Sequence, residues 1–337
     1  MSRALLSLAS TLLAVLLLEG AMRVTRLDER LLRRGLYYQQ AELPVHQCSA
    51  DPFLHYELKP GASFRGSRPD GQSYEVSIDA NGARCPAHVR RKAASTFRML
   101  CFGGSTMYGA GVNDDQTIPA ALEARLNRLP RPTPASALRY EVWNFGTSAY
   151  TLGQAAHLAR SRLSTLDPDG IVIQLHNVGR RPYLPAPLCD AVDFGDRDFF
   201  LEQFPVPGWV DAQLHLTLLA QSAVYRALIA QSVRAGDGAP CEYCDRLSQS
   251  EARTLVQEAG ARHVAVLFMA IPADRGVIRP DGVYAGLPAA QLVDLYRPGR
   301  EPGFYEVHPS AATLDEYASM LLDAMGEHGL FATDGRP

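Results

Sequence analysis

The sequence predicts an α/β fold built on a parallel sheet, and three observations support this. From Thr96 onward, apolar runs of strand length alternate with amphipathic runs of helical length. The apolar runs have no polar face, which is typical of parallel strands that helices cover on both sides. With 337 residues, of which 47% are hydrophobic, the chain can also bury a sizeable core.

The expected elements follow one another along the chain. The predicted strands are 97–102, 140–145, 170–175 and 263–270, and the predicted helices are 118–129, 152–166, 250–260 and 311–329. We expect a domain over residues 95–330, with an insertion at about 178–247 where the alternation lapses. Residues 24–94 read as a juxtamembrane helix followed by a small β-rich preamble, because the alternating run "SYEVSID" precedes a turn.

The N-terminus carries an uncharged, mostly apolar run from Ala4 to Leu18. A signal-peptide core has this length, but small residues at cleavage spacing are missing near Glu19, so we expect an uncleaved membrane anchor over residues 1–23. A buried hydrophobic helix is the alternative. The arginines after this run favour a cytoplasmic body by the positive-inside rule. Early apolar segments of this kind more often export the rest of their chain, and we expect an extracytoplasmic (periplasmic) body.

Charge and cysteine content exclude some classes of function. A net charge of -3 gives no basic face for a nucleic-acid partner. The pair Cys241 and Cys244 forms a single CxxC, which lacks the second pair or the histidines that a zinc site needs. Cys101, inside an apolar strand, is expected to be a plain buried thiol. We therefore expect no metal and no organic cofactor.

The stretch "FGGSTMYGAGV", residues 102–112, follows the first predicted strand and lies where α/β sheets bind ligands. It lacks the lysine of a phosphate-binding P-loop and the third glycine of a dinucleotide fingerprint. It also has Met107 where the GxSxG elbow has its second glycine. Two glycines before Ser105 let the chain turn sharply, which favours presentation of a nucleophile. An ordinary helix-capping serine is the alternative.

Three further motifs follow later strands or precede the last helix: "NFGTSAY", "LHNVG" and "VHPSA". A serine, a backbone donor, an amide and a histidine that converge at one sheet edge are the groups needed for acyl transfer. With "GGSTMYGAGVNDDQTIPAALEARL" and "VSIDANGARCP", these motifs resemble the SGNH hydrolases, or GDSL-type esterases, in a membrane-anchored bacterial "GGST" branch. The resemblance covers about residues 51–328 and implies a three-layer αβα sandwich of flavodoxin-like type.

The resemblance also implies roles for individual residues. Ser105 is the nucleophile and first oxyanion donor, and His308 is the general base. Asn177 supplies a side-chain donor, and Ala149 replaces a glycine as backbone donor. Gly104 and His176 are expected to contact substrate.

The position of the family's acid, three residues before the histidine, is Tyr305 here. Three outcomes stay open: Glu306 orients His308, the site works as a Ser-His dyad, or the site has decayed. The sequence thus predicts a serine hydrolase that cleaves or transfers an O-acyl group, acting on a small-molecule, lipid or glycan ester. A catalytically degenerate binding or scaffolding protein is the alternative.

Overall fold

The structure of the protein is a computed structural model. The residues that the structure describes are 3–25, 43–51, 53–54, 56–68, 70–84, 88–129, 138–148, 150–175, 242–271, 292–295, 304–305 and 308–329. The chain divides into two compact units. The first comprises Met1–Gln40, Cys48–His55 and Arg181–Cys244. The second comprises Ala41–Gln47, Tyr56–Arg180 and Asp245–Pro337.

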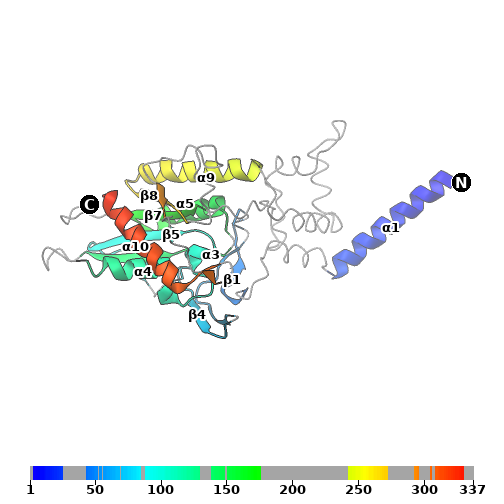
Figure 1. Ribbon diagram of the computed structural model, residues 1–337. Helices are drawn as coiled ribbons and strands as arrows, with labels where there is room; N and C mark the ends of the chain where they lie inside the picture. Colours follow the sequence, from blue (N-terminus) through cyan, green and yellow to red (C-terminus); the bar gives the residue numbers. More distant parts are fainter. Residues whose placement is uncertain are drawn as a thin grey trace. The chain divides into compact units, whose positions relative to one another are not determined.

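A five-stranded parallel sheet forms the centre of the second unit (Figure 1). Its strands are β5 (Thr96–Phe102), β6 (Arg139–Asn144), β7 (Gly170–Leu175), β8 (Ala265–Ala270) and β9 (Leu292–Asp294). They are arranged in the order β6-β5-β7-β8-β9, and each neighbouring pair is parallel. The chain leaves β5 on one side to form β6 and then returns to the other side for β7. This reversal creates a switch point, beyond which ligands bind in open α/β sheets.

Helices cover both faces of the sheet. The four long helices of this unit are α4 (Ile118–Leu126), α5 (Leu152–Leu166), α9 (Glu242–Gly260) and α10 (Ala311–Glu327). Helices α4 and α10 pack against each other on one face, and α5 and α9 lie on the other (Figure 1). The fold is therefore the predicted three-layer αβα sandwich around a parallel sheet.

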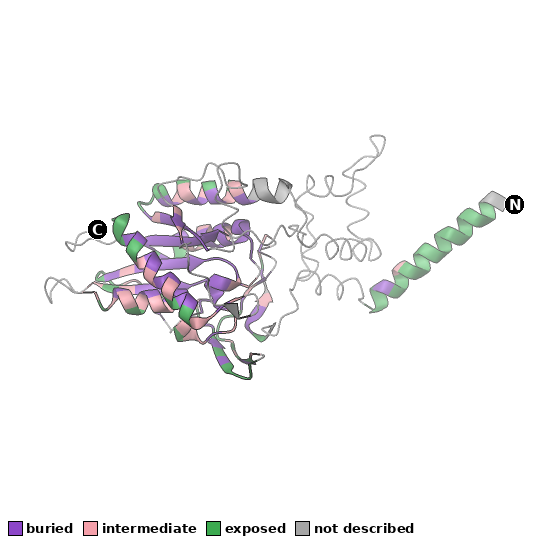
Figure 2. Cartoon of the chain, viewed as in Figure 1, coloured by how far each residue is buried: buried purple, intermediate pink, exposed green. Residues whose placement is uncertain are grey.

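The strands are apolar because both faces of the sheet are buried, and this is the pattern from which the fold was predicted. Side chains alternate across β5: Met99 and Cys101 belong to the core cluster that includes α4 and α10, whereas Leu100 and Phe102 are buried outside that cluster. Strand residues are buried along almost their whole length (Figure 2). Several predicted boundaries were wrong. The helix expected over 250–260 begins at Glu242, and the helix expected over 118–129 ends at Leu126. The strand expected over 263–270 begins at Ala265, because His263 adopts a left-handed conformation (φ 58°) in the turn after α9.

The preamble contains the predicted hairpin. Strands β3 (Ser63–Ser67) and β4 (Ser73–Ser77) pair antiparallel. A second pair is formed by β1 (His46–Cys48), which follows the short 3-10 helix η1 (Leu43–Val45), and β2 (Tyr56–Leu58). The buried faces of these segments pack with Tyr108 of the glycine-rich turn in one hydrophobic cluster. The preamble therefore supports the turn that carries Ser105.

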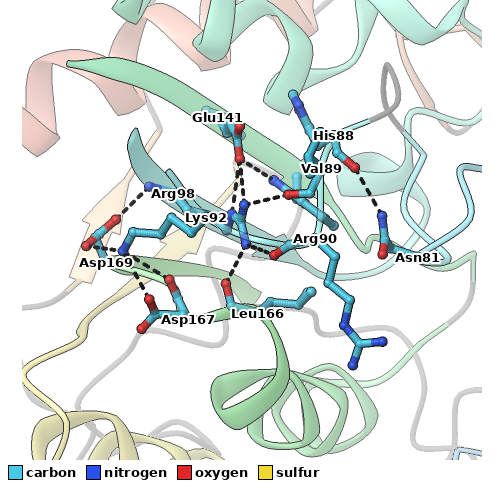
Figure 3. Close-up of polar contacts among 12 residues, drawn as sticks. Asn81, His88, Val89, Arg90, Lys92, Arg98, Glu141, Leu166, Asp167 and Asp169 are labelled. Atoms are coloured by element: carbon cyan, nitrogen blue, oxygen red, sulfur yellow. Dashed lines mark hydrogen bonds and ion pairs between the residues drawn. The ribbon is translucent and has the colours of Figure 1, made fainter. Parts of the chain in front are cut away.

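A cluster of charged groups closes the amino-terminal end of the sheet (Figure 3). The side chain of Arg98 is fully buried and lies 3.0 Å from the buried carboxylate of Glu141. It also donates to the carbonyl oxygens of Arg90 (2.8 Å) and Leu166 (2.7 Å). The Asp169 carboxylate accepts the Arg98 backbone N–H at 2.7 Å. Because these charges have partners, the cost of burying them is offset, and the cluster lies at the end of the sheet away from Ser105.

The described part of the first unit is mainly helix α1 (Arg3–Thr25). Its segment Leu5–Thr25 has a mean hydropathy of 2.0 and is exposed along nearly all its length (Figure 2). This helix is long and apolar enough to cross a membrane, and a signal sequence has the same properties. The predicted juxtamembrane helix and most of the predicted insertion lie outside the described residues.

Candidate active site

Ser105 lies just beyond the carboxyl end of β5, at the switch point of the sheet. It is the first residue of the one-turn helix α3 (Ser105–Tyr108). Within the fully described segment 101–109, every residue except Ser105 is buried. Neither the Oγ nor the N–H of Ser105 has a hydrogen-bond partner among the described residues. The turn therefore buries its other residues and leaves Ser105 half-buried, with a hydroxyl that has no partner among the described residues, as the nucleophile hypothesis requires.

The start of α3 is held by Gln174 of the neighbouring strand β7. The N-cap residue Gly104 provides no side-chain hydrogen bond. Instead, Gln174 Oε1 accepts the backbone N–H of Met107 at 3.1 Å. A Cβ on Gly103 would lie only 2.6 Å from the Gln174 Cβ, so the glycine makes room for this side chain.

The end of α3 is held by Arg84, which comes from the preamble. Its side chain is fully buried and donates to the carbonyl oxygens of Tyr108 (3.0 Å) and Gly109 (2.8 Å). It also forms an ion pair with Asp114 at 2.8 Å, at the start of the 3-10 helix η2 (Asp114–Gln116). A cation near the last carbonyls of a helix is favourable, and here it also fixes the chain as it leaves α3. Gly109 takes the left-handed conformation (φ 85°) that ends the helix.

The loop after β6 packs directly on α3. Asn144 Oδ1 accepts the N–H of Gly146 at 2.9 Å, and its Nδ2 donates to the Tyr108 carbonyl at 3.3 Å. A Cβ on Gly146 would lie 2.3 Å from the Tyr108 nitrogen, which shows how closely the two backbones approach. The Thr147 N–H donates to the Gly103 carbonyl at 2.9 Å. The loop after β6 and the turn after β5 therefore lie in contact at the same edge of the sheet.

Ala149, the predicted backbone donor, lies outside the described residues, but its neighbours are described. The Tyr56 hydroxyl donates to the Ser148 carbonyl at 2.6 Å. The Tyr150 hydroxyl donates to the Tyr56 carbonyl. Both sides of position 149 are thus tied to strand β2, in the same loop that contacts α3.

His308 begins β11 (His308–Pro309), which pairs antiparallel with β10 (Phe304–Tyr305). Strand β11 is in contact with α3, so the elements that carry Ser105 and His308 are neighbours. The packing of α10 on α4 explains this, because α10 begins three residues after His308 and α4 follows the Ser105 turn. Ser310 caps α10 by accepting the Thr313 N–H at 3.3 Å.

Of the remaining predicted site residues, only Gly104 lies within the described part of the chain. Gly104 is buried at the N-cap of α3. His176, Asn177 and Glu306 lie outside the described residues. Tyr305, at the position of the family's acid, pairs in register with His308 across the β10–β11 ladder. The backbone at position 305 thus lies directly opposite that of His308 in the ladder.

Three site-forming residues were missed by the sequence reasoning: Arg84, Asn144 as a brace of α3, and Gln174. Two of them had a faint signal, since Gln174 interrupts the otherwise apolar run "GIVIQL" and Arg84 is the one charge in "ANGARCP". Cys101 is fully buried, and burial raises the pKa of its thiol, so it is not a competing nucleophile. Among the described residues, no group of three His, Cys, Asp or Glu side chains could hold a metal ion.

Comparison with known proteins found similarity to solved structures only. No family model and no curated protein matches the chain. Similar structures include a lipolytic protein of the G-D-S-L family from Desulfitobacterium hafniense, at 11% identity and a TM-score of 0.35, covering 67% of this chain and 98% of that one.

Two further neighbours are enzymes by their descriptions. An α/β hydrolase from the metagenome of Lake Arreo has 16% identity and a TM-score of 0.36, covering 71% of this chain and 98% of that one. An acetylxylan esterase from Geobacillus stearothermophilus has 14% identity and a TM-score of 0.25, covering 71% and 97% of the two chains. The fold assignment rests on the sheet order and the two helical layers.

Proposed function

We propose that this protein is a membrane-anchored serine hydrolase of SGNH type, which cleaves or transfers an O-acyl group through an acyl-Ser105 intermediate. The contact between α3 and β11 is the observation that carries the proposal. It brings the elements bearing an accessible serine and a histidine together at the switch point of a parallel sheet. The sequence motifs that resemble the family supply the same pair of residues.

In the proposed reaction, His308 takes the proton of Ser105 as Oγ attacks the ester carbonyl carbon. The N–H of Ser105, the N–H of Ala149 and the side chain of Asn177 stabilise the oxyanion. Each such donor contributes about 10² to 10³ in rate. The intermediate collapses as the C–O bond to the alcohol breaks and His308 protonates the leaving oxygen. Attack of water or of an acceptor alcohol on the acyl-serine then completes hydrolysis or transfer.

Two alternatives stay open for how His308 is oriented. Glu306 is one candidate, and a Ser-His dyad is another, because Tyr305 occupies the usual acid position. Loss of the acid in the serine-protease template costs about 10⁴ in kcat, so a dyad would be a slow enzyme. The tyrosine at the usual acid position also supports a second function, a binding or scaffolding protein that has lost the triad acid.

A fluorophosphonate probe tests the proposal, because only an activated serine displaces its fluoride and forms a Ser–phosphorus bond. We expect covalent labelling of the full-length chain in detergent. Labelling should be lost in Ser105→Ala and reduced by about 10²-fold or more in His308→Gln. Ser161→Ala is the matched control, since this serine lies on α5 and its hydroxyl donates to the Leu158 carbonyl. A folded protein that is not labelled would favour the binding function.

The substrate is proposed as a small-molecule, lipid or glycan ester, and the anchor as helix α1 with a periplasmic body. Incubating the active protein with an acyl donor and either water alone or a sugar acceptor distinguishes hydrolase from O-acyltransferase. Acylated sugar forming faster than free acid would identify the transferase. Protease protection of the body in intact cells, lost when the outer membrane is permeabilised, would support the extracytoplasmic orientation.

A further inference from the structure

We propose that Gln174 is a positioning residue for Ser105, which its side chain holds in place by capping helix α3 from strand β7. The inference rests on the proposed function, in which Ser105 is the nucleophile. No motif of the sequence marked Gln174 for this role. It acts through the backbone of α3 and not by contact with substrate.

Helix α3 needs an external brace because it has one turn only. The first N–H groups of a helix have no intrahelical acceptor, and a side chain at the N-cap usually satisfies one of them. Here the N-cap is Gly104, which has no side chain to offer. The third N–H of the helix, that of Met107, is buried and needs an acceptor. Gln174 Oε1 provides it at 3.1 Å.

The turn and the strand are shaped to fit this contact. Gln174 is fully buried in β7, where the residues on either side are apolar. It reaches α3 across Gly103, where a Cβ would lie 2.6 Å from the Gln174 Cβ and 2.8 Å from its Oε1. A larger residue at position 103 would therefore push the amide away from the Met107 N–H. The glycine of the turn and the glutamine of the strand form one unit.

The choice of a neutral amide also suits the proposed chemistry. By taking the Met107 N–H, Gln174 fixes α3 while the N–H of Ser105 keeps no partner among the described residues. The amide adds no negative charge beside the oxyanion that the reaction would form. A fixed α3 matters because a displacement of about 1 Å at a reacting group can cost about 10² in rate.

The experiment compares the rate constant for fluorophosphonate labelling (kinact) and the half-saturating probe concentration (KI) in five full-length proteins: the wild type, Ser105→Ala, two Gln174 variants and a control variant in β7. Gln174→Met keeps the length of the side chain and removes the acceptor. We expect kinact to fall about 10- to 100-fold, with KI changed by less than about threefold. Gln174→Glu keeps an acceptor oxygen but adds a negative charge near the oxyanion, so its kinact should fall below the wild type and still exceed that of the methionine variant by about fivefold or more.

Ile171→Val is the matched control in the same strand. Ile171 is buried but does not belong to the cluster with Met107, α4 and α10, so it faces the other side of the sheet. Ile171→Val removes one methyl group, so it should lower the free energy of unfolding, which urea unfolding measures. Its kinact should stay within about twofold of the wild type. If the methionine variant does not fold, Gln174→Asn replaces it, since its amide is one methylene too short to reach Met107.

The outcomes separate this inference from the proposed function. If Ser105→Ala abolishes labelling while Gln174→Met keeps kinact within about twofold of the wild type, Ser105 is the nucleophile and the positioning role is wrong. Equal kinact values for the Met and Glu variants would also overturn the role of the acceptor oxygen. If the wild-type protein is not labelled at all, both the function and the positioning role fail.

Discussion

Gly146 gives the sharpest test of how tightly the site is built, through the substitution Gly146→Ala. The new Cβ would lie 2.3 Å from the Tyr108 nitrogen, whereas ordinary contacts begin at 3.4 Å, so the backbones must separate by 3.4 − 2.3 = 1.1 Å. Helix α3 can move aside only by straining the hydrogen bonds of Gln174 at its start and of Arg84 at its end. We expect an overpacking cost of about 1–3 kcal/mol in the free energy of unfolding.

The same displacement should appear in function. A shift of this size at Ser105 should lower kinact for fluorophosphonate labelling by about 10²-fold. Gly170→Ala is the matched control, because its Cβ would approach no atom closer than 3.4 Å, the Met99 methyl. Urea unfolding and labelling rates are measured for both variants. If Gly146→Ala labels within about twofold of Gly170→Ala, the close approach of the two backbones does not position Ser105 and the reasoning is refuted.

Two further predictions concern stability away from the nucleophile. Arg84→Met should lower the free energy of unfolding by about 3–5 kcal/mol, because it leaves Asp114 and the buried carbonyls of Tyr108 and Gly109 without their cation. Urea unfolding checks this, and an equal loss in Arg84→Lys would show that the fork geometry is what matters. At the α5–α9 contact, burial raises the pKa of Glu251, but hydrogen bonds from His157 and Arg160 outweigh it and the net pKa is lowered. A carboxylate with a lowered pKa stabilises the fold above its unfolded pKa of about 4.3 and loses that contribution as the pH falls through the folded value. The stability gap between wild type and Glu251→Gln, measured at about pH 7 and at about pH 4 or below, should therefore shrink on acidification, and a gap that grows would contradict the assignment.

The elements that the sequence predicted well are those whose signal is local. The strand at 170–175 and the helix at 152–166 have the predicted bounds, because one is a continuous apolar run and the other is amphipathic. A capping box between Thr151 and Gln154 also fixes where that helix begins. Helix α3 could not be predicted in this way, because four residues contain no helical period to read.

The braces of the site depend on contacts between distant parts of the chain. Gln174 and Met107 are 67 positions apart, and in sequence the glutamine reads only as a polar break in an apolar strand. Arg84 lies 24 positions from Tyr108, in a loop of the preamble. A pattern of hydrophobic residues does not say which carbonyl or N–H a buried polar side chain will meet, because that depends on how the strands are ordered.

The sequence by itself determined the layered α/β fold, the apolar N-terminal helix and the proposal of Ser105 and His308 as the reacting pair. These come from hydrophobic periodicity and from motifs whose residues carry their own chemistry. Tertiary structure alone decided that β7 lies beside β5, that β11 contacts α3, and that a glutamine and an arginine hold the serine's turn at its two ends. The physical reason is that buried polar groups must be satisfied by whatever partner packing brings within reach, and packing is a property of the whole fold.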